Sequence, residues 1–345
     1  MTNKLLFNNK SKEDLLQDLK LEDFNRLTLS FYRYVEIDDP NFLRDRLYKE
    51  WSNLNILGRI YVSKEGINAQ ISCPSPNLEL FKEKLCLHNP FKDIIIKFAV
   101  KEGHSFHKLV IKVKDEIVAY GIEENEYNMK RVGRHLNPEE FNSAIDDSDS
   151  IVIDMRNYYE SEVGKFKGAM IPNVETSREL LPEVKRLLKG KENKKILMYC
   201  TGGIRCEKAS SFLIKNGFND VNQLNGGIIN YAHSVIKKEI KSKFVGKNFV
   251  FDSRLGERIT SHILSQCHQC GEPSDDHIDC KNDACHILFI QCSDCSKQYE
   301  QCCSKECMEF NNLPIEEQKI LRKDPDRVVS KSKNSVSGKP RLNKI

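Results

Sequence analysis

The sequence lacks any apolar run that approaches the roughly 18 residues of a membrane-spanning helix. Its first residues, MTNKLLFNNKSKEDLLQDL, also lack the apolar stretch and the small-residue cleavage site of a signal peptide. A large excess of one charge is missing too, since 54 Lys and Arg residues face 50 Asp and Glu residues. Charge alone therefore does not favour a nucleic acid partner. We expect a soluble, cytoplasmic protein that makes no contact with a membrane.

At 345 residues the chain is long enough for two or three domains, each with its own apolar core, and it contains no internal repeat. After a polar lead-in at 1–25, apolar segments and helices alternate in the order β-α-β-β-α-β, followed by one more strand. Two strand-helix-strand units on an antiparallel sheet predict a ferredoxin-like (acylphosphatase-like) domain over 26–120. The expected strands are 27–35, 56–63, 67–73, 94–100 and 108–114, and the expected helices begin at Pro40 and Pro76.

A second pattern follows a polar connector at 121–140. Over 141–241, short apolar strands alternate with helices, which is typical of a parallel sheet covered on both faces. The strands are expected at 150–155, 194–200 and 220–224, and the helices at 178–189, 207–216 and 228–238. The whole chain is thus an α+β domain followed by an α/β domain.

The cysteines are unevenly placed. Of 13 cysteines, nine lie between Cys267 and Cys307, in a segment at 263–310 that follows a bridge at 242–262. Clustering of this kind in a long chain without an export signal favours metal binding over disulfides. Close pairs with tetrahedral-zinc spacing suggest up to two Zn²⁺ sites, although the spacing does not say which pairs share a metal. We predict the ligands Cys267, Cys270, Cys280, Cys285, Cys292, Cys295, Cys303 and Cys307, with Cys302 as the alternative to Cys303.

After this segment, residues 311–345 are expected to form a helix and then a basic, disordered tail, since 328–345 contain five Lys or Arg residues and no acid.

The stretch KKILMYCTGGIRCEKASSFLIKNG carries the strongest catalytic signal. A strand runs into Cys200, a Gly-Gly turn follows, and a helix begins after Arg205. Backbone N–H groups curled around the sulfur, with the helix N-terminus and Arg205, lower the pKa of a thiol and create a nucleophile. We therefore predict Cys200 as the catalytic residue and Arg205 as an anion stabiliser. The loop amides that would bind substrate belong to Thr201, Gly202, Gly203, Ile204 and Cys206.

Loop length separates several interpretations. Four residues lie between Cys200 and Arg205, whereas cysteine-dependent phosphatases have a wider loop with about five, which argues against a phosphatase. The shorter loop fits one extra sulfur atom, a persulfide. A buried cysteine that only closes a core strand is the alternative for Cys200. Cys206 is either a resolving thiol or a small apolar residue of the first helical turn.

The first domain also carries basic and aromatic residues on its expected strands. Arg59, Lys64 and Lys112, with Tyr61 and Phe31 nearby, form either an RNA-facing patch or an ordinary solvated sheet face. The sequence does not decide between the two.

Several motifs resemble those of known families. Residues 147–241 resemble a rhodanese domain, through Asp154-Met-Arg156-Asn157 with the following Glu160, the Cys200 loop, and Gln223-Leu-Asn-Gly226-Gly227-Ile. The chain from 26 to 310 resembles a narrower group, the rhodanese-like tRNA uridine hydroxylases (TrhO). The motifs shared with that group are SKEGINAQIS, DMRNYYESEVGKFKGA, YCTGGIRCEKAS, GKNFVFDSRLGERI and the cysteine pairs.

This resemblance implies a bacterial oxidoreductase that uses dioxygen to form 5-hydroxyuridine at the wobble position, 34, of tRNA. It also implies that Cys200 is the essential cysteine, as a nucleophile or a persulfide carrier. From the residues themselves, a thiol that adds to carbon 6 of uracil makes carbon 5 nucleophilic, and no flavin or nicotinamide site is evident. Two alternatives stay open: a persulfide sulfurtransferase that acts on RNA or a protein, and an RNA-binding module without catalysis. The sequence does not identify the tRNA isoacceptors, the electron donor or the oligomeric state.

Overall fold

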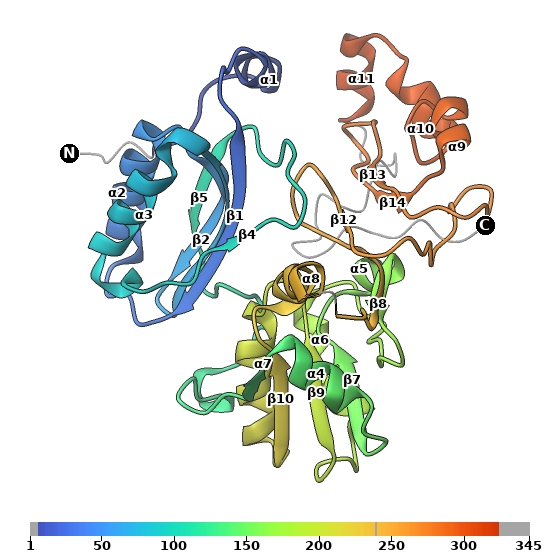
Figure 1. Cartoon of the computed structure of the whole chain (residues 1–345). Coiled ribbons are helices and arrows are strands. Elements are labelled where there is room, and N and C mark those ends of the chain that lie inside the picture. The colour runs from blue at the N-terminus through green and yellow to red at the C-terminus, as the bar shows by residue number, and fades with distance from the viewer. Residues whose placement is uncertain (1–5, 239, 324–345) are drawn as a thin grey trace. The chain divides into compact units, whose positions relative to one another are not determined.

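The structure is a computed structural model that describes residues 6–238 and 240–323 (Figure 1). The basic tail expected at 328–345 lies outside the described residues. Backbone contacts divide the chain into two units that both draw on separate parts of the sequence. The first unit contains Met1–Ile151, Gly190–Lys241 and Phe251–Arg254, and the second contains Val152–Lys189, Ser242–Val250 and Leu255–Ile345.

The N-terminal part of the first unit is a five-stranded sheet with the order β4-β1-β3-β2-β5. All neighbours are antiparallel except β2 and β5, which run parallel. The order of the first four strands is that of a ferredoxin-like fold, so the predicted fold class is confirmed. Strand β4 is shorter than the expected 94–100, because it pairs with β1 at only two positions on the sheet edge. The strands are β1 (Arg26–Tyr34), β2 (Leu57–Ser63), β3 (Gly66–Pro74), β4 (Lys97–Phe98) and β5 (Leu109–Val113).

Helices α2 (Pro40–Asn53) and α3 (Leu78–Leu87) cover one face of this sheet (Figure 1). Asp39 begins α2 by accepting hydrogen bonds from the backbone N–H groups of Asn41 and Phe42. Beneath the helices, Phe31, Trp51 and Phe81 pack together with ring centroids 5.5–6.2 Å apart. Helix α1 (Lys12–Lys20) precedes the sheet, and short 3₁₀ turns lie at Ser75–Asn77 and Asn89–Phe91.

The second sheet is parallel, with the order β6-β10-β9-β7, as expected for the rhodanese-like part of the chain. The segment expected to be a connector, 121–140, contains a 3₁₀ turn at Glu124–Glu126 and the strand β6, which lies beside β10. The boundary between the two units passes through β7. The elements are β6 (Arg134–Leu136), α4 (Pro138–Ile145), β7 (Ser150–Asp154), β9 (Lys195–Tyr199), α7 (Ile204–Lys215), β10 (Asp220–Leu224) and α8 (Gly227–Lys238).

The second unit holds a three-stranded sheet, β12-β11-β8, and a two-stranded sheet of β13 and β14. Near its start, Asp154 and Arg156 form a fully buried ion pair of 2.7 Å, and the Ser161 hydroxyl donates to the same carboxylate. The remaining elements of this unit are α5 (Tyr158–Glu162), β8 (Gly164–Phe166), α6 (Ser177–Leu187), β11 (Phe244–Asn248), β12 (Glu257–Arg258), β13 (His277–Asp279), β14 (Leu288–Ile290), α9 (Ser293–Gln298), α10 (Lys305–Asn311) and α11 (Ile315–Leu321).

Candidate active site and cysteine clusters

The Cys200 loop joins the end of β9 to the start of α7 within the first unit. Gly203 caps the helix with φ at 98°, a left-handed conformation that glycine adopts without strain. Its backbone N–H donates to the Cys200 Sγ atom at 3.1 Å. The helix thus begins at Ile204, three residues earlier than expected, and the first helical turn faces the sulfur.

The surroundings of Cys200 lower the pKa of its thiol to about 6. The side chain is fully buried, and burial alone would raise that pKa. A hydrogen bond with the Cys206 thiol, the charge of Arg205, and the backbone N–H groups of Cys206 and Gly203 outweigh the effect of burial. A thiol with this pKa is mostly thiolate at neutral pH, which is the form that acts as a nucleophile.

The start of α8, just after the turn that follows β10, donates two backbone hydrogen bonds to carbonyl groups of the Cys200 loop. The backbone N–H of Ile228 donates to the Cys200 carbonyl at 3.0 Å, and that of Ile229 donates to the Thr201 carbonyl at 3.1 Å. Gly227 lies so close that a Cβ atom there would be 2.5 Å from the Cys200 carbonyl oxygen, and its φ is +68°. Only glycine fits this position without moving the loop.

Arg205 is itself fixed by its surroundings. It is 7% exposed, its guanidinium lies 5.7 Å from the centre of the Phe251 ring, and its Nη2 donates to the Thr201 hydroxyl at 3.4 Å. A buried guanidinium held over an aromatic ring is available to stabilise negative charge near the sulfur.

Three tyrosines contact this loop: Tyr32 and Tyr34 belong to β1, and Tyr120 to the segment that follows β5. The Tyr34 hydroxyl donates to the Ile204 carbonyl at 3.3 Å, and the Tyr120 hydroxyl donates to the Arg205 carbonyl at 2.9 Å. Tyr32 lies over Gly203, since a Cβ at Gly203 would be 2.9 Å from the Tyr32 hydroxyl oxygen. Burial, helped by the charges of Glu207 and Cys200, raises the pKa of Tyr32 well above its ordinary value, so this phenol stays protonated.

Lys97 is a further cation at this site. Its Nζ atom lies 4.5 Å from the centre of the Tyr32 ring. Burial lowers the pKa of Lys97 to about 8, and the negative charges of Cys200 and Glu207 oppose this shift only in part. Lys97 and the three tyrosines could not be predicted from the sequence, because their approach to the loop depends on tertiary packing. For Tyr32, Tyr34 and Lys97 the only signal was their place on the expected strands 27–35 and 94–100.

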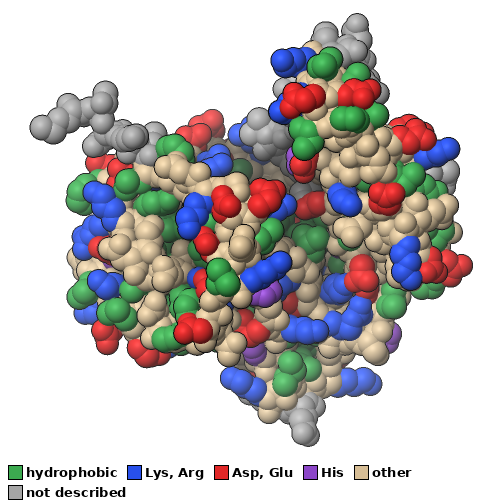
Figure 2. All heavy atoms as spheres, turned by 90° about the horizontal axis from the view of Figure 1, so that it is seen from above, with side chains coloured by type: hydrophobic (Ala, Val, Ile, Leu, Met, Phe, Trp, Pro, Cys, Tyr) green, Lys and Arg blue, Asp and Glu red, His purple; other side chains and the backbone are tan. Residues whose placement is uncertain are grey.

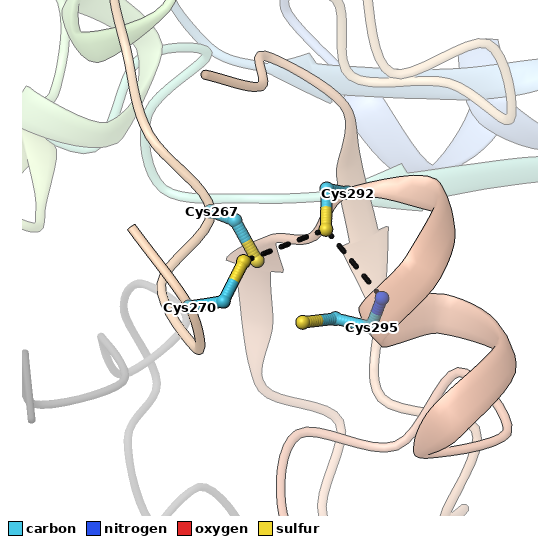
Figure 3. Close-up of side chains that lie close together, drawn as sticks. All are labelled: Cys267, Cys270, Cys292 and Cys295. Carbon is cyan, nitrogen blue, oxygen red and sulfur yellow. Dashed lines mark hydrogen bonds between the residues drawn. The ribbon is translucent and has the colours of Figure 1, made fainter. Parts of the chain in front are cut away.

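Four cysteines in the second unit gather around one point. Cys267, Cys270, Cys292 and Cys295 have sulfur atoms that all lie within 4.8 Å of one another. Figure 3 shows these sulfurs directed toward a common centre, with the Cys270 and Cys292 sulfurs 3.6 Å apart. Cys292 is the N-cap of α9, and its sulfur accepts a hydrogen bond from the backbone N–H of Cys295 at 3.4 Å.

A second group of four cysteines has the same spacing between its sulfur atoms. It consists of Cys280, Cys285, Cys303 and Cys307, again with all sulfurs within 4.8 Å of one another. Four thiolates about 2.3 Å from a tetrahedral zinc ion would be separated by about 3.8 Å, so both groups fit such an ion. The ninth cysteine of the segment, Cys302, is fully buried and belongs to neither group. The two groups together contain the eight cysteines that the sequence suggested as ligands.

The face of the molecule drawn in Figure 2 has no dominant charge. Figure 2 shows acidic and basic side chains interspersed over the face it presents. Among the described residues, no helix is long and apolar enough to cross a membrane.

Each of three parts of the chain matches a known protein family. Residues 26–117 match the UPF0176 acylphosphatase-like domain, 137–234 match the rhodanese-like domain, and 245–308 match the rhodanese C-terminal family. A tRNA uridine(34) hydroxylase of Leptospira interrogans is 53% identical over 332 residues, which cover 95% of this chain and 90% of that protein. The tRNA uridine(34) hydroxylase of Cronobacter sakazakii is 45% identical over 96% of this chain and 97% of its own length.

The cysteine loop between a parallel strand and a helix defines a rhodanese-type domain, here joined to an acylphosphatase-like domain. At these identities over nearly the full length, the chain belongs to the tRNA uridine(34) hydroxylase family. The resemblance seen in the sequence is therefore confirmed.

Proposed function

We propose that this chain hydroxylates carbon 5 of uridine 34 in tRNA, with dioxygen as co-substrate and Cys200 as nucleophile. The observation that carries the proposal is a buried thiol with a pKa of about 6, surrounded by N–H donors, in a member of this family. As an enzyme acting on tRNA, the chain would work in the cytoplasm.

The first step assigned to the site is addition of the Cys200 thiolate to carbon 6 of the uracil ring. The C6–S bond forms, and the electron pair of the C5=C6 bond moves toward the oxygen on carbon 4 as an enolate. Arg205, the loop N–H groups and protonated Lys97 stabilise that developing negative charge. The enolate makes carbon 5 nucleophilic toward dioxygen, which an unactivated uracil is not.

The overall reaction balances as a monooxygenation. One oxygen atom of dioxygen stays on carbon 5, and the other leaves as water after it accepts two electrons and two protons. We assign these electrons to a thiol reductant, of which two molecules become one disulfide. Loss of the proton from carbon 5 and of the Cys200 thiolate from carbon 6 then restores the double bond and frees the enzyme.

The test is nucleoside mass spectrometry of tRNA from a deletion strain that carries the wild-type gene, the Cys200→Ser variant or neither. We expect 5-hydroxyuridine derivatives to disappear in the deletion strain and to return only with the wild type. The purified enzyme, supplied with isotopically labelled dioxygen, should place the label on carbon 5. Hydroxylated tRNA in the Cys200→Ser strain, or label that enters only from water, would contradict the proposal.

The length of the loop favours one alternative function, a persulfide sulfurtransferase. Because the loop encloses Cys200 closely, it fits a single added sulfur atom. Transfer of labelled sulfur from thiosulfate to Cys200 and then to an acceptor, together with unchanged 5-hydroxyuridine levels, would favour this second function.

We also propose that both cysteine groups hold structural zinc, which would link distant parts of the C-terminal segment. The ligands would be Cys267, Cys270, Cys292 and Cys295 in one site and Cys280, Cys285, Cys303 and Cys307 in the other.

A further inference from the structure

The N-terminal sheet has one face covered by helices and one face that is polar. Along β1, β2 and β3, Leu29, Phe31, Ile60 and Ile71 point into the core beneath α2 and α3. Because side chains alternate along a strand, the residues between them lie on the opposite face. This places Phe31 in the core, so it is not part of an RNA-facing patch.

The registers show which residues share the polar face. One row across the sheet contains Lys97, Ser30, Gln70, Arg59 and Val110, and the next contains Tyr32, Asn68, Tyr61 and Lys112. Three of these nine positions are cationic and none is acidic. We call this set of nine residues the open face.

One end of the open face belongs to the candidate active site. Tyr32 and Lys97 are the residues that lie beside Gly203 and Cys200. From Tyr32 on β1 to Lys112 on β5 there are three strand spacings, or about 14 Å. The open face therefore runs from the reactive sulfur to β5, and at its middle the Asn68 side chain donates to the Ile117 carbonyl at 3.2 Å.

The residues at the other end of the open face are accessible to solvent. Arg59 and Lys112 are exposed and Tyr61 is partly exposed. Within the described part of the chain, the side chains of these three residues make no hydrogen bond or ion pair. Opposite charges on neighbouring strands stabilise a sheet, but none of the nine positions is acidic, so the face itself does not neutralise these cations.

The positive charge continues around the edge strand β5. Lys12, Lys108 and Lys112 line a pocket of about 320 Å³ between the N-terminal segment, α2 and this strand. Burial and then the charges of Lys108, Lys12 and Arg59 lower the pKa of His107, which lines the same pocket. The field at this edge of the sheet is thus positive, as a phosphate backbone requires.

We propose that the open face binds the single-stranded nucleotides that flank the target uridine in the anticodon loop. Tyr61 stacks on a base, while Arg59 and Lys112 contact phosphates; this inference rests on the proposed function. Sheet faces that carry aromatic residues stack two or three unpaired bases in this way, and stacking does not depend on base identity. RNA, rather than an acidic protein, is the occupant because the face combines an aromatic ring with cations and continues into the site where a uridine must react.

The test measures binding without turnover. The full-length Cys200→Ser protein is titrated with a fluorescent anticodon stem-loop whose loop contains the unmodified uridine, by fluorescence anisotropy at several salt concentrations. In this background, Tyr61→Ala should weaken binding by about 5- to 100-fold, the loss expected for one stacked base. Tyr61→Phe, which keeps the ring, should bind within about twofold of the parent.

The charge contacts have their own readout. Arg59→Ala combined with Lys112→Ala should reduce the slope of log affinity against log salt by about 1.4, as expected for two lost contacts to a single strand. The matched control is Lys49→Ala with Lys84→Ala, which removes two charges from α2 and α3 on the other side of the sheet. This control should leave both the affinity and the slope unchanged.

Three results would overturn the inference: unchanged affinity with Tyr61→Ala, an equal loss with Tyr61→Phe, or an equal change in slope with the control pair. Hydroxylation of the same stem-loop by the Cys200-containing enzyme is measured in parallel. If the enzyme binds through the open face but does not hydroxylate, the proposed function fails and the binding site stands. If the enzyme hydroxylates the stem-loop, but Tyr61→Ala and the Arg59/Lys112 double variant bind it normally, the open-face inference fails and the proposed function stands.

Discussion

The ammonium group of Lys208 lies 2.9 Å from the carboxylate of Glu65, which joins the helix after the Cys200 loop to the β2–β3 turn of the N-terminal sheet. A second carboxylate, that of Glu116, lies 2.7 Å from the same nitrogen. The Lys208 side chain is only 1% exposed. Burial lowers its pKa, but the hydrogen bonds and charges of the two carboxylates outweigh this effect and raise the pKa above its ordinary value. Through this cluster, the sheet that carries Tyr32 and Lys97 is held against the helix that carries Arg205.

Replacing Lys208 by Met should be strongly destabilising. The change leaves two partly buried carboxylates without their cation, and breaking a buried ion pair from one side costs about 3–5 kcal/mol. We expect a loss of this size in the free energy of unfolding, measured with urea at pH 7. Because the pKa of Lys208 is raised, its contribution is fully present below about pH 10.5 and is lost as the pH rises through the raised value.

Two variants control this measurement. Lys208→Met combined with Glu65→Gln and Glu116→Gln removes the stranded charges and should recover part of the loss. Lys215→Met, at an exposed position on the same helix, should change stability by less than about 0.5 kcal/mol. A small effect of Lys208→Met alone would show that the cluster does not hold the two elements together.

The rate of hydroxylation should first rise and then fall as the pH increases. Activity rises as the pH passes about 6, because the Cys200 thiol must lose its proton. It falls as the pH passes about 8, because Lys97 is then neutral and no longer stabilises the enolate. The profile of kcat/KM for tRNA, at saturating dioxygen, should therefore be bell-shaped with a maximum near about pH 7.

Lys97→Arg tests the assignment of the alkaline limb. Arginine stays protonated to above about pH 12, so the alkaline limb should disappear while the acid limb stays in place. An alkaline limb that persists unchanged in this variant would assign that limb to another group.

The lowered pKa of Cys200 also affects the free energy of unfolding. Because the thiolate is favoured in the folded state, it contributes stability above the ordinary thiol pKa of 9.0, and this contribution is lost as the pH falls through about 6.

Gly227→Ala should inactivate the enzyme through the position of the loop. The added Cβ would lie 2.5 Å from the Cys200 carbonyl oxygen and 2.8 Å from the Gly203 nitrogen, both backbone atoms that cannot rotate away. We expect the N–H groups to move away from the sulfur, the Cys200 thiol pKa to rise toward 9.0, and the hydroxylation rate at pH 7 to fall by about 100-fold.

The pH dependence of Cys200 alkylation by iodoacetamide, followed by peptide mass spectrometry, measures the change in pKa. Gly217→Ala is the control, because its φ is also positive, at +91°, but a Cβ there would meet open space. An alkylation profile for Gly227→Ala that matches the wild type would show that the loop tolerates the side chain.

The sequence was sufficient where the chemistry is local. Cys200, the glycines and Arg205 follow one another within a single strand-to-helix turn, so their relation to the sulfur could be predicted from order alone. Lys97 and Tyr32 could not be predicted, because they approach the loop only when two sheets pack together. Similarly, β6 was expected to be part of a connector, since its three residues carry little apolar signal and become a strand only by pairing with β10.

For the cysteine pairs, too, the sequence does not show which residues come together in the fold. Three pairs were visible in the sequence, and the fourth left a choice between Cys302 and Cys303. The pairs are interleaved in the structure: Cys267 and Cys270 join Cys292 and Cys295, while Cys280 and Cys285, which lie between them, join Cys303 and Cys307. Spacing identifies a pair because a short turn places both sulfurs together. It does not identify the second pair of a site, which depends on how β13 and β14 bring the turns together.

This interleaving leads to a specific prediction for the metal content. The protein should contain two zinc ions per chain, measured by elemental mass spectrometry after gel filtration. Cys270→Ser and Cys285→Ser should each lower this by about one ion, and the two changes together should remove both. Each single change should also lower the midpoint of thermal unfolding of the C-terminal segment, because a structural site contributes its binding free energy to folding.

Cys302→Ser separates ligation from packing. Its side chain is fully buried in the same segment, yet it lies outside both groups, so this variant should keep two zinc ions even if it loses some stability. Loss of an ion from Cys302→Ser, or loss of both ions from Cys270→Ser alone, would mean that the sulfurs are shared differently from the two groups described here. Retention of two ions by Cys270→Ser would exclude that thiol as a ligand. The pattern across these variants thus tests the grouping itself, independently of whether the enzyme is active.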